Sequence, residues 1–220
     1  GTMDGRDQGD AQISEAELVA KHAQGYPPSI NAGALTVMAS FSSWNGVKHH
    51  GNASLLTDVL KNRMGFAGLV VGDWNGHGQV AGCSATDCAA AINAGLDLFM
   101  APDSWKGLFA STLLAARDGR ISAARLDDAV RRIVRVKYKL GLMGDAVDNI
   151  PGIPSVGEKT AAKLLAEYDT MEGIFAHAEE IKGKLGEKIR EFADQGRLSK
   201  VLARILTDVP IDLDERDLLR

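Results

Sequence analysis

The sequence predicts two structural classes in one chain, an α/β segment over residues 1–142 and an all-α module over residues 143–220. In the first segment short apolar runs alternate with helical patterns, which is typical of parallel strands joined by right-handed crossovers. After Met143 the strong strand runs stop, and glycine and charged residues fill the spaces between helical patterns. A chain of 220 residues is long enough for two small domains that each bury a core.

Three apolar runs are expected to form the sheet of the first segment. Residues 35–41 are continuously apolar, as in a strand that is buried on both faces. The other two strands are expected at 68–72 and 96–100. Three strands are too few for a closed barrel, which needs eight, so sheet edges are expected to stay uncovered. We therefore expect a homo-oligomer that covers these edges, with a compact monomer as the alternative.

Helical patterns separate these strands. Ser14 is expected to cap the first helix, which breaks before Pro27 and Pro28. Ser84 and Asp87 resemble a capping box that would begin another helix. In the first segment, helices are expected at 14–22, 55–63, 84–93, 105–117 and 122–140. In the module, they are expected at 159–168, 171–176, 183–192 and 198–205.

The charge of the chain excludes a general attraction to nucleic acids or acidic membranes. The net charge is −4, and it is unevenly distributed. Residues 1–143 carry 14 Lys/Arg and 13 Asp/Glu, whereas residues 144–220 carry 11 and 16. No apolar run approaches the roughly 20 residues of a membrane span, and no signal peptide is visible. We expect a soluble, cytoplasmic protein without a membrane partner.

The cysteines and three of the histidines give weak signals. Cys83 and Cys88 fit neither a zinc pair nor a disulfide framework, so we expect free thiols. His49, His50 and His77 lie in loops after expected strands, where metal ligands can occur. Without a convergent carboxylate pattern we expect that His77 lines a pocket instead.

Four segments, in order, resemble the C-terminal half of the barrel domain of glycoside hydrolase family 3. They are residues 4–10 (DGRDQGD), 37–46 (VMASFSSWNG), 68–74 (GLVVGDW) and 94–100 (AGLDLFM). The resemblance extends over residues 4–142 and implies a partial (β/α)8 barrel. It also implies that Asp73 is the catalytic nucleophile.

The position of Asp73 is consistent with that role. A carboxylate at the C-terminal end of a parallel strand lies where barrel enzymes perform their chemistry. Trp44 and Trp74 could form an apolar wall for a sugar ring, with His77 beside them. Retaining glycosidases also need a second carboxylate about 5 Å away. In the family this acid comes from a following domain that another segment replaces here, so Asp73 is expected to be vestigial. Taken alone, Asp73 would be a strand-end cap.

The second segment resembles the helix–three-turn–helix region of the 5′-nuclease domain of bacterial DNA polymerase I and flap endonucleases. The matching stretches are residues 143–152 (MGDAVDNIPG), 157–165 (GEKTAAKLL), 182–185 (KGKL) and 207–210 (TDVP). The resemblance implies a helix–hairpin–helix-type module that binds duplex DNA. It also implies that turn carbonyls at 152–157 hold K+.

The turn before residue 158 explains this binding physically. Successive backbone N–H groups at a helix start can hold one phosphate without reading sequence. Lys159 and Lys163 can reach neighbouring phosphates. Affinity rises with the number of phosphates neutralised, so an acidic module should bind weakly. The candidate DNA-binding residues are Gly152, Ile153, Val156, Gly157, Lys159, Thr160 and Lys163.

Asp145 and Asp148 match carboxylates that help to hold divalent metal in the nuclease family. Two-metal cleavage of a phosphodiester needs several more carboxylates, which lie in a family region not found in this chain. These two residues are therefore expected to be vestigial ligands that bind Mg2+ weakly, and no cofactor is required.

Together these patterns predict a recombined or engineered chimera without intact catalytic function. The parental classes would be a retaining β-glucosidase and a 5′-3′ exonuclease or flap endonuclease. One alternative is weak, non-sequence-specific binding of duplex DNA by the helical module. The other is residual O-glycosyl hydrolase or 5′-nuclease activity.

Overall fold

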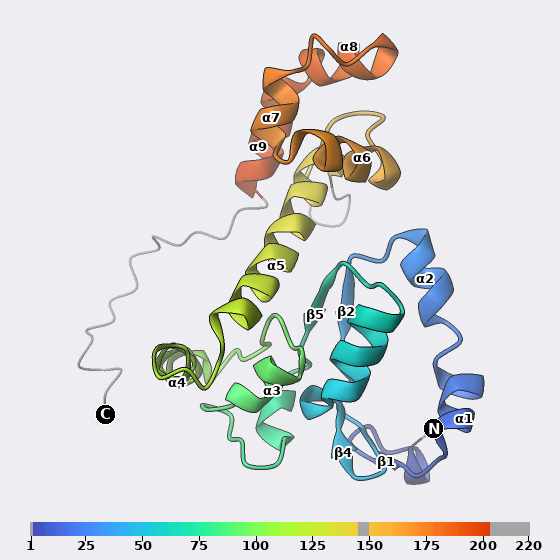
Figure 1. Ribbon diagram of the computed structural model, residues 1–220, viewed down its shortest axis with the longest axis vertical. Helices are drawn as coiled ribbons and strands as arrows, with labels where there is room; N and C mark the ends of the chain where they lie inside the picture. The colour runs from blue at the N-terminus through green and yellow to red at the C-terminus, as the bar shows by residue number, and fades with distance from the viewer. Residues whose placement is uncertain (1, 145–149, 203–220) are drawn as a thin grey trace. The chain divides into compact units, whose positions relative to one another are not determined.

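A computed structural model describes residues 2–144 and 150–202 (Figure 1). The chain divides into two compact units with a boundary between Ile133 and Val134. Unit 1 contains the residues before this boundary, and unit 2 the described residues after it. The boundary falls inside one helix, α5 (Ala123–Met143), so each unit contains part of this helix.

The main sheet of unit 1 is parallel, as predicted. Strand β2 (Thr36–Met38) pairs with β5 (Leu69–Val71), and Val37 lies opposite Val70. The third expected strand is reduced to an isolated parallel bridge between Val71 and Leu98. This arrangement brings the C-terminal ends of the three segments to the same edge (Figure 1).

The prediction that the first strand is buried on both faces is wrong. Met38 is 49% exposed, and Thr36 is exposed as well. Within the described residues β2 pairs only with β5, so its other edge has no neighbouring strand. The apolar run at 35–41 has the composition of a strand that is covered on both faces, but unit 1 does not cover it in this way.

A second sheet contains three short strands, the first of which lies in the N-terminal segment. Strand β1 (Asp10–Ala11) pairs in parallel with β3 (Ser43–Trp44), which forms a hairpin with β4 (Val47–Lys48). Asn45 has a positive φ of 48° in this turn, a conformation that asparagine tolerates.

The first helical region agrees with its predicted start. Ser14 forms a capping box with Glu17 at the beginning of α1 (Glu15–Glu17), which continues as a π-helix, η2 (Leu18–His22). The predicted break is confirmed, because η2 ends at His22, but the two prolines begin a further helix, α2 (Tyr26–Ala32), that was not predicted. Proline is tolerated in a first helical turn because those N–H groups have no intrahelical partner.

The cysteine prediction is also wrong, because Cys83 and Cys88 form a disulfide with a Cα–Cα distance of 4.8 Å. This bond closes a short loop in which Ser84 and Asp87 bridge each other instead of forming a capping box. The next helix, α3 (Ala89–Ala94), begins only after the disulfide.

The remaining helices of unit 1 lie close to their predicted positions. A π-helix, η4 (Ser54–Arg63), packs beside β2 and β5 through Leu56 and Leu60 (Figure 1). Helix α4 (Trp105–Arg117) has its predicted bounds. Short 3-10 helices occur at Met3–Gly5 (η1), His49–Gly51 (η3) and Gly76–Gln79 (η5).

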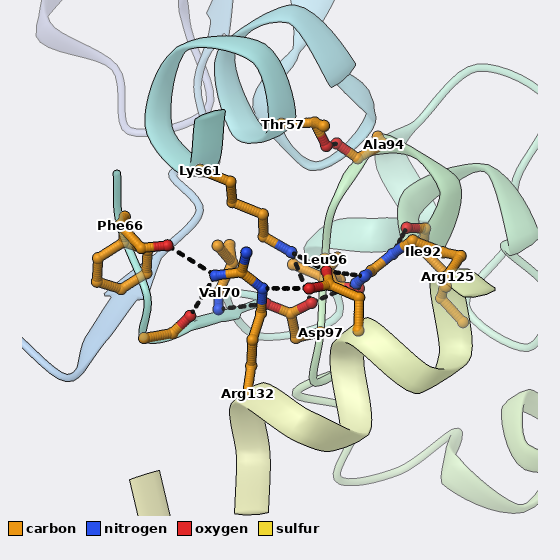
Figure 2. A network of polar contacts seen from close by, with 12 residues as sticks. Thr57, Lys61, Phe66, Val70, Ile92, Ala94, Leu96, Asp97, Arg125 and Arg132 are labelled. Carbon is orange, nitrogen blue, oxygen red and sulfur yellow. Dashed lines mark hydrogen bonds and ion pairs between the residues drawn. The ribbon is translucent and has the colours of Figure 1, made fainter. Parts of the chain in front are cut away.

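A buried ion cluster joins α5 to this sheet (Figure 2). The Asp97 carboxylate is fully buried, pairs with Lys61 Nζ at 2.7 Å and also pairs with Arg125. It accepts a hydrogen bond from the backbone N–H of Val70 as well. Arg132 donates to two backbone carbonyls before β5 and pairs with Asp128. A buried charge is tolerated only when it is paired in this way.

Unit 2 is helical, as predicted. Its helices after α5 are α6 (Glu158–Tyr168), α7 (Met171–Ala176), α8 (Gly183–Glu191) and α9 (Ala193–Leu202). Their core contains Leu142, Ile153, Met171, Ile174 and Ile189. The chain thus consists of a mixed α/β unit and a helical unit. Among the described residues, no helix has the length and apolarity needed to cross a bilayer.

Candidate functional site

Asp73 lies two residues after Val71, the last residue of β5, and begins a turn. Its carboxylate accepts a hydrogen bond of 2.7 Å from the backbone N–H of Trp74. Its own backbone N–H donates to Nε2 of His50 at 2.8 Å, and its carbonyl accepts from the N–H of Gly76. The side chain is half-buried. The backbone on both sides of this carboxylate is therefore held in place.

His50 acts as a neutral hydrogen-bond acceptor in this turn. Burial lowers its pKa to about 4, although the charge of Asp73 opposes this effect. Because Nε2 accepts from Asp73, the proton of the neutral ring lies on Nδ1. Gly76 packs so closely that a Cβ there would lie 2.3 Å from His50 Cε1. The sequence drew attention to His50 only as one of three histidines, because its contact with Asp73 is tertiary.

The predicted sugar-binding residues differ in their surroundings. Trp74 follows Asp73 directly and is 55% exposed, so it offers an open aromatic surface beside the carboxylate. His77 is buried, with Nε2 2.8 Å from the carbonyl of Ala85. Trp44 donates from Nε1 to the carbonyl of Ile13 at 2.9 Å and lines a cavity of about 260 Å³. Of these three residues, Trp74 alone combines exposure with direct adjacency to Asp73.

No group of three His, Cys, Asp or Glu side chains within 2–144 and 150–202 could hold a metal ion. Asp145 and Asp148, the predicted vestigial ligands, lie outside the described residues.

The predicted DNA-binding turn of unit 2 lies immediately before α6. Ser155 has a positive φ of 69°, and Gly157 is the extended N-cap residue of the helix. Both residues are exposed, as are Lys159 and Lys163 on the helix that follows. Thr160 is half-buried. The turn therefore presents backbone N–H groups at a helix N-terminus with two lysines nearby, an arrangement that suits an anion.

Ile153 and Val156, which the sequence also assigned to DNA binding, point inward. Both side chains belong to the core of unit 2. The N–H of Ile153 donates to the carbonyl of Leu142 at 2.7 Å, and the N–H of Val156 donates to the carbonyl of Ile153. These two residues can contribute to an anion site only through the shape that they give the turn.

Comparison with known families accounts for both parts of the chain. Residues 1–136 match the model described as glycosyl hydrolase family 3 N terminal domain. Residues 134–220 match the model described as 5'-3' exonuclease, C-terminal SAM fold. The chain belongs to glycosyl hydrolase family 3 through its first part, and the match of its second part to a different family makes it a chimera.

Individual relatives divide in the same way. DNA polymerase I of Bacillus subtilis is 55% identical over 74 residues, which are 33% of this chain and 8% of the relative. The periplasmic beta-glucosidase of Salmonella typhimurium is 30% identical over 154 residues, which are 66% of this chain and 19% of the relative.

A solved structure supports the glycosidase match. The Q683A mutant of exo-1,3/1,4-beta-glucanase from a Pseudoalteromonas species is 40% identical with a TM-score of 0.64. The match covers 80% of this chain and 28% of that one. The chain thus spans less than a third of the length of each of these three relatives.

Proposed function

We propose that this chain is a folded chimera without intact catalytic function, which retains a vestigial glycosidase nucleophile and a vestigial phosphate-binding turn. The observation that carries the first half of the proposal is the environment of Asp73. Within the described residues its carboxylate accepts from the backbone N–H of Trp74, and its backbone N–H donates to His50. From residue 134 onward the chain matches a nuclease family instead of the rest of a glycosidase. Retaining glycosidases need a second carboxylate about 5 Å from the nucleophile.

A nucleophile without its acid would lose most of its rate. General acid catalysis contributes about 10²- to 10⁴-fold, and positioning of the sugar contributes further. Trp74 supplies one open aromatic surface beside Asp73, whereas His77 is bonded to the backbone at Ala85. Any residual hydrolysis would be of β-glucosides, the substrates named for the relatives. Comparison of the purified chain with its Asp73→Asn variant on an aryl β-glucoside tests this part.

The turn of unit 2 favours a second function, weak binding of duplex DNA without sequence preference. The first N–H groups of α6 have no intrahelical partner, and the helix dipole adds a partial positive charge at this end. Lys159 and Lys163 are exposed on the same helix. One turn and two lysines neutralise few phosphates, so the affinity should be low and salt-sensitive. In this proposal, turn carbonyls within 152–157 bind K+ beside the phosphate.

Fluorescence anisotropy of a labelled duplex at low salt tests this binding. Gly157→Asp places a carboxylate at the N-terminus of α6 and should abolish the signal by repelling the phosphate. Gly25→Asp is the matched control, because both glycines have negative φ values and open space around a new Cβ. Equal affinity of Gly157→Asp and Gly25→Asp would contradict binding at this turn.

We propose no nuclease activity for this chain. Asp145 and Asp148 would bind Mg2+ weakly and support no cleavage, which an assay of a 5′-flap substrate with Mg2+ tests.

The uncovered edge of β2 would pair with a second copy of the chain. Sedimentation at tens of micromolar tests this association, and a sharp monomer would contradict it.

A further inference from the structure

We infer that helix α9 positions the phosphate-binding turn by holding both backbone polar groups of Gly152. This inference rests on the DNA binding proposed for unit 2, but its geometric part can be tested alone. Ser199 and Gln195, on one side of α9, are the residues that contact Gly152. Neither residue belongs to the predicted DNA contacts.

Three hydrogen bonds connect Gly152, Ser199 and Gln195 to one another, two of them between the helix and the turn and one within the helix. The N–H of Gly152 donates to Ser199 Oγ at 2.9 Å, and Gln195 Nε2 donates to the carbonyl of Gly152 at 2.9 Å. The Ser199 hydroxyl in turn donates to the carbonyl of Gln195 at 2.8 Å. Ser199 is fully buried. Burial of a hydroxyl costs free energy unless it is hydrogen-bonded, and here one hydroxyl satisfies both the turn and its own helix.

The backbone at Gly152 is closely packed and leaves no room for a side chain. Its φ is +62°, and a Cβ on it would lie 2.2 Å from the backbone nitrogen of Gly144. The N–H of Ile153, the next residue, donates to the carbonyl of Leu142 at 2.7 Å. The turn is therefore fixed between the end of α5 on one side and α9 on the other.

Helix α9 also packs closely against an apolar side chain of the turn, that of Ile153. A Cβ on Gly196 would lie 3.1 Å from Cδ1 of Ile153 and 2.9 Å from the ring of Phe175. The absence of a side chain at this position lets the helix approach the turn closely. Gln195, Gly196 and Ser199 thus hold Gly152 and Ile153, the two residues that begin the turn.

A turn whose start is held by α9 should bind phosphate more tightly. The N–H groups proposed to face the phosphate come a few residues later, at Ser155, Gly157 and the start of α6, whereas the N–H of Val156 donates to Ile153. A turn whose first residues are fixed loses less conformational freedom on binding, and preorganisation of this kind raises affinity. Ser199 and Gln195 are thus positioning residues for the phosphate site.

The test compares Ser199→Ala, Gln195→Met and the double variant in the full chain, by anisotropy with a labelled duplex. Each single variant should weaken binding about threefold to tenfold, the range expected for the loss of one net hydrogen bond. The slope of log affinity against log salt should stay unchanged, because no cation is removed. Lys163→Ala is the contrast, since loss of one phosphate-neutralising charge should reduce that slope by about 0.9.

Amide exchange supplies a readout that needs no DNA. In Ser199→Ala the N–H of Gly152 should exchange faster, while the N–H of Ile153, which donates to Leu142, should stay protected. Circular dichroism at the assay temperature confirms that each variant is folded. Unchanged exchange at Gly152, or unchanged affinity in both single variants when the parent binds, overturns the inference. If Gly152 loses protection but the parent chain binds no duplex, the positioning by α9 stands and the proposed DNA binding fails.

Discussion

The Nε2 atom of His50 accepts a hydrogen bond of 2.8 Å from the backbone N–H of Asp73. This contact fixes the residue that we propose as a vestigial nucleophile, and it requires a neutral imidazole ring. Burial lowers the pKa of His50 to about 4. The turn at the end of β5 is thus linked to the protonation of a histidine on the 3-10 helix η3.

We predict that His50 makes unit 1 less stable as the pH falls from about 6.5 to about 4. The ordinary pKa of 6.5 means that the unfolded chain binds a proton in this window, whereas folded His50 stays neutral. Stability therefore rises with pH across the window, and the contribution of His50 is largest at the upper end. Between pH 7 and pH 4.5 the loss should be about 2 to 3 kcal/mol.

Urea unfolding followed by tryptophan fluorescence measures this loss. All three tryptophans belong to unit 1, so the signal reports on that unit. His50→Gln keeps a neutral side chain at every pH, and the difference between the two proteins isolates the histidine. The same pH dependence in both proteins would contradict the prediction.

A second prediction concerns the buried ion cluster of Figure 2. Asp97→Ala leaves Lys61 and Arg125 without their shared carboxylate, and Lys61 is itself buried. Removal of one partner from a buried pair costs about 3 to 5 kcal/mol. Asp118→Ala is the control, because the pair of Asp118 with Arg120 is substantially exposed and should contribute little to stability. Equal urea midpoints for the two variants would argue against the role of the cluster.

The third prediction concerns the disulfide. Cys83→Ser with Cys88→Ser should lower the free energy of unfolding by about 2 kcal/mol, the loop-entropy value for so short a loop. It should also loosen the loop whose Ala85 carbonyl contacts His77. Thiol titration of the denatured, unreduced parent chain should find no free thiol, and two free thiols per chain would refute the bond. A disulfide persists in oxidising compartments and is rare in the cytosol, so a bond found by this titration would count against the predicted cytoplasmic location.

Helices with strong local patterns could be predicted from the sequence. Helix α4 begins at Trp105 and ends at Arg117, as the apolar spacing indicated, and α7 has its expected bounds. Ser14 caps α1 because its capping box is formed by neighbouring residues. In each case the determining contacts lie within a few residues of one another.

Features that depend on distant residues could not be predicted in this way. Residues 35–41 read as a fully buried strand, but burial of Met38 depends on neighbours that the described residues do not provide. The pairing of Cys83 with Cys88 depends on how the loop is folded, and the spacing alone does not determine it. The sequence drew attention to Asp73, but not to the role of His50 in holding it.

The same limit applies to the turn in unit 2. Its glycines and the lysines of α6 are evident in the sequence, because they lie within one continuous stretch. The hydrogen bonds of Gly152 to Ser199 and Gln195 join residues that are far apart along the chain. No local pattern around Ser199 indicates this contact, because a serine inside a helix is usually exposed.

The most direct test of the proposal is the difference in aryl β-glucoside hydrolysis between the purified parent chain and Asp73→Asn. Samples should be matched for folding by circular dichroism, and the substrate should be p-nitrophenyl β-glucoside at saturating concentration. We predict that both proteins release p-nitrophenol at the rate of buffer alone. A rate in the parent chain that is well above buffer and is lost in Asp73→Asn would show that the glycosidase half is catalytically intact.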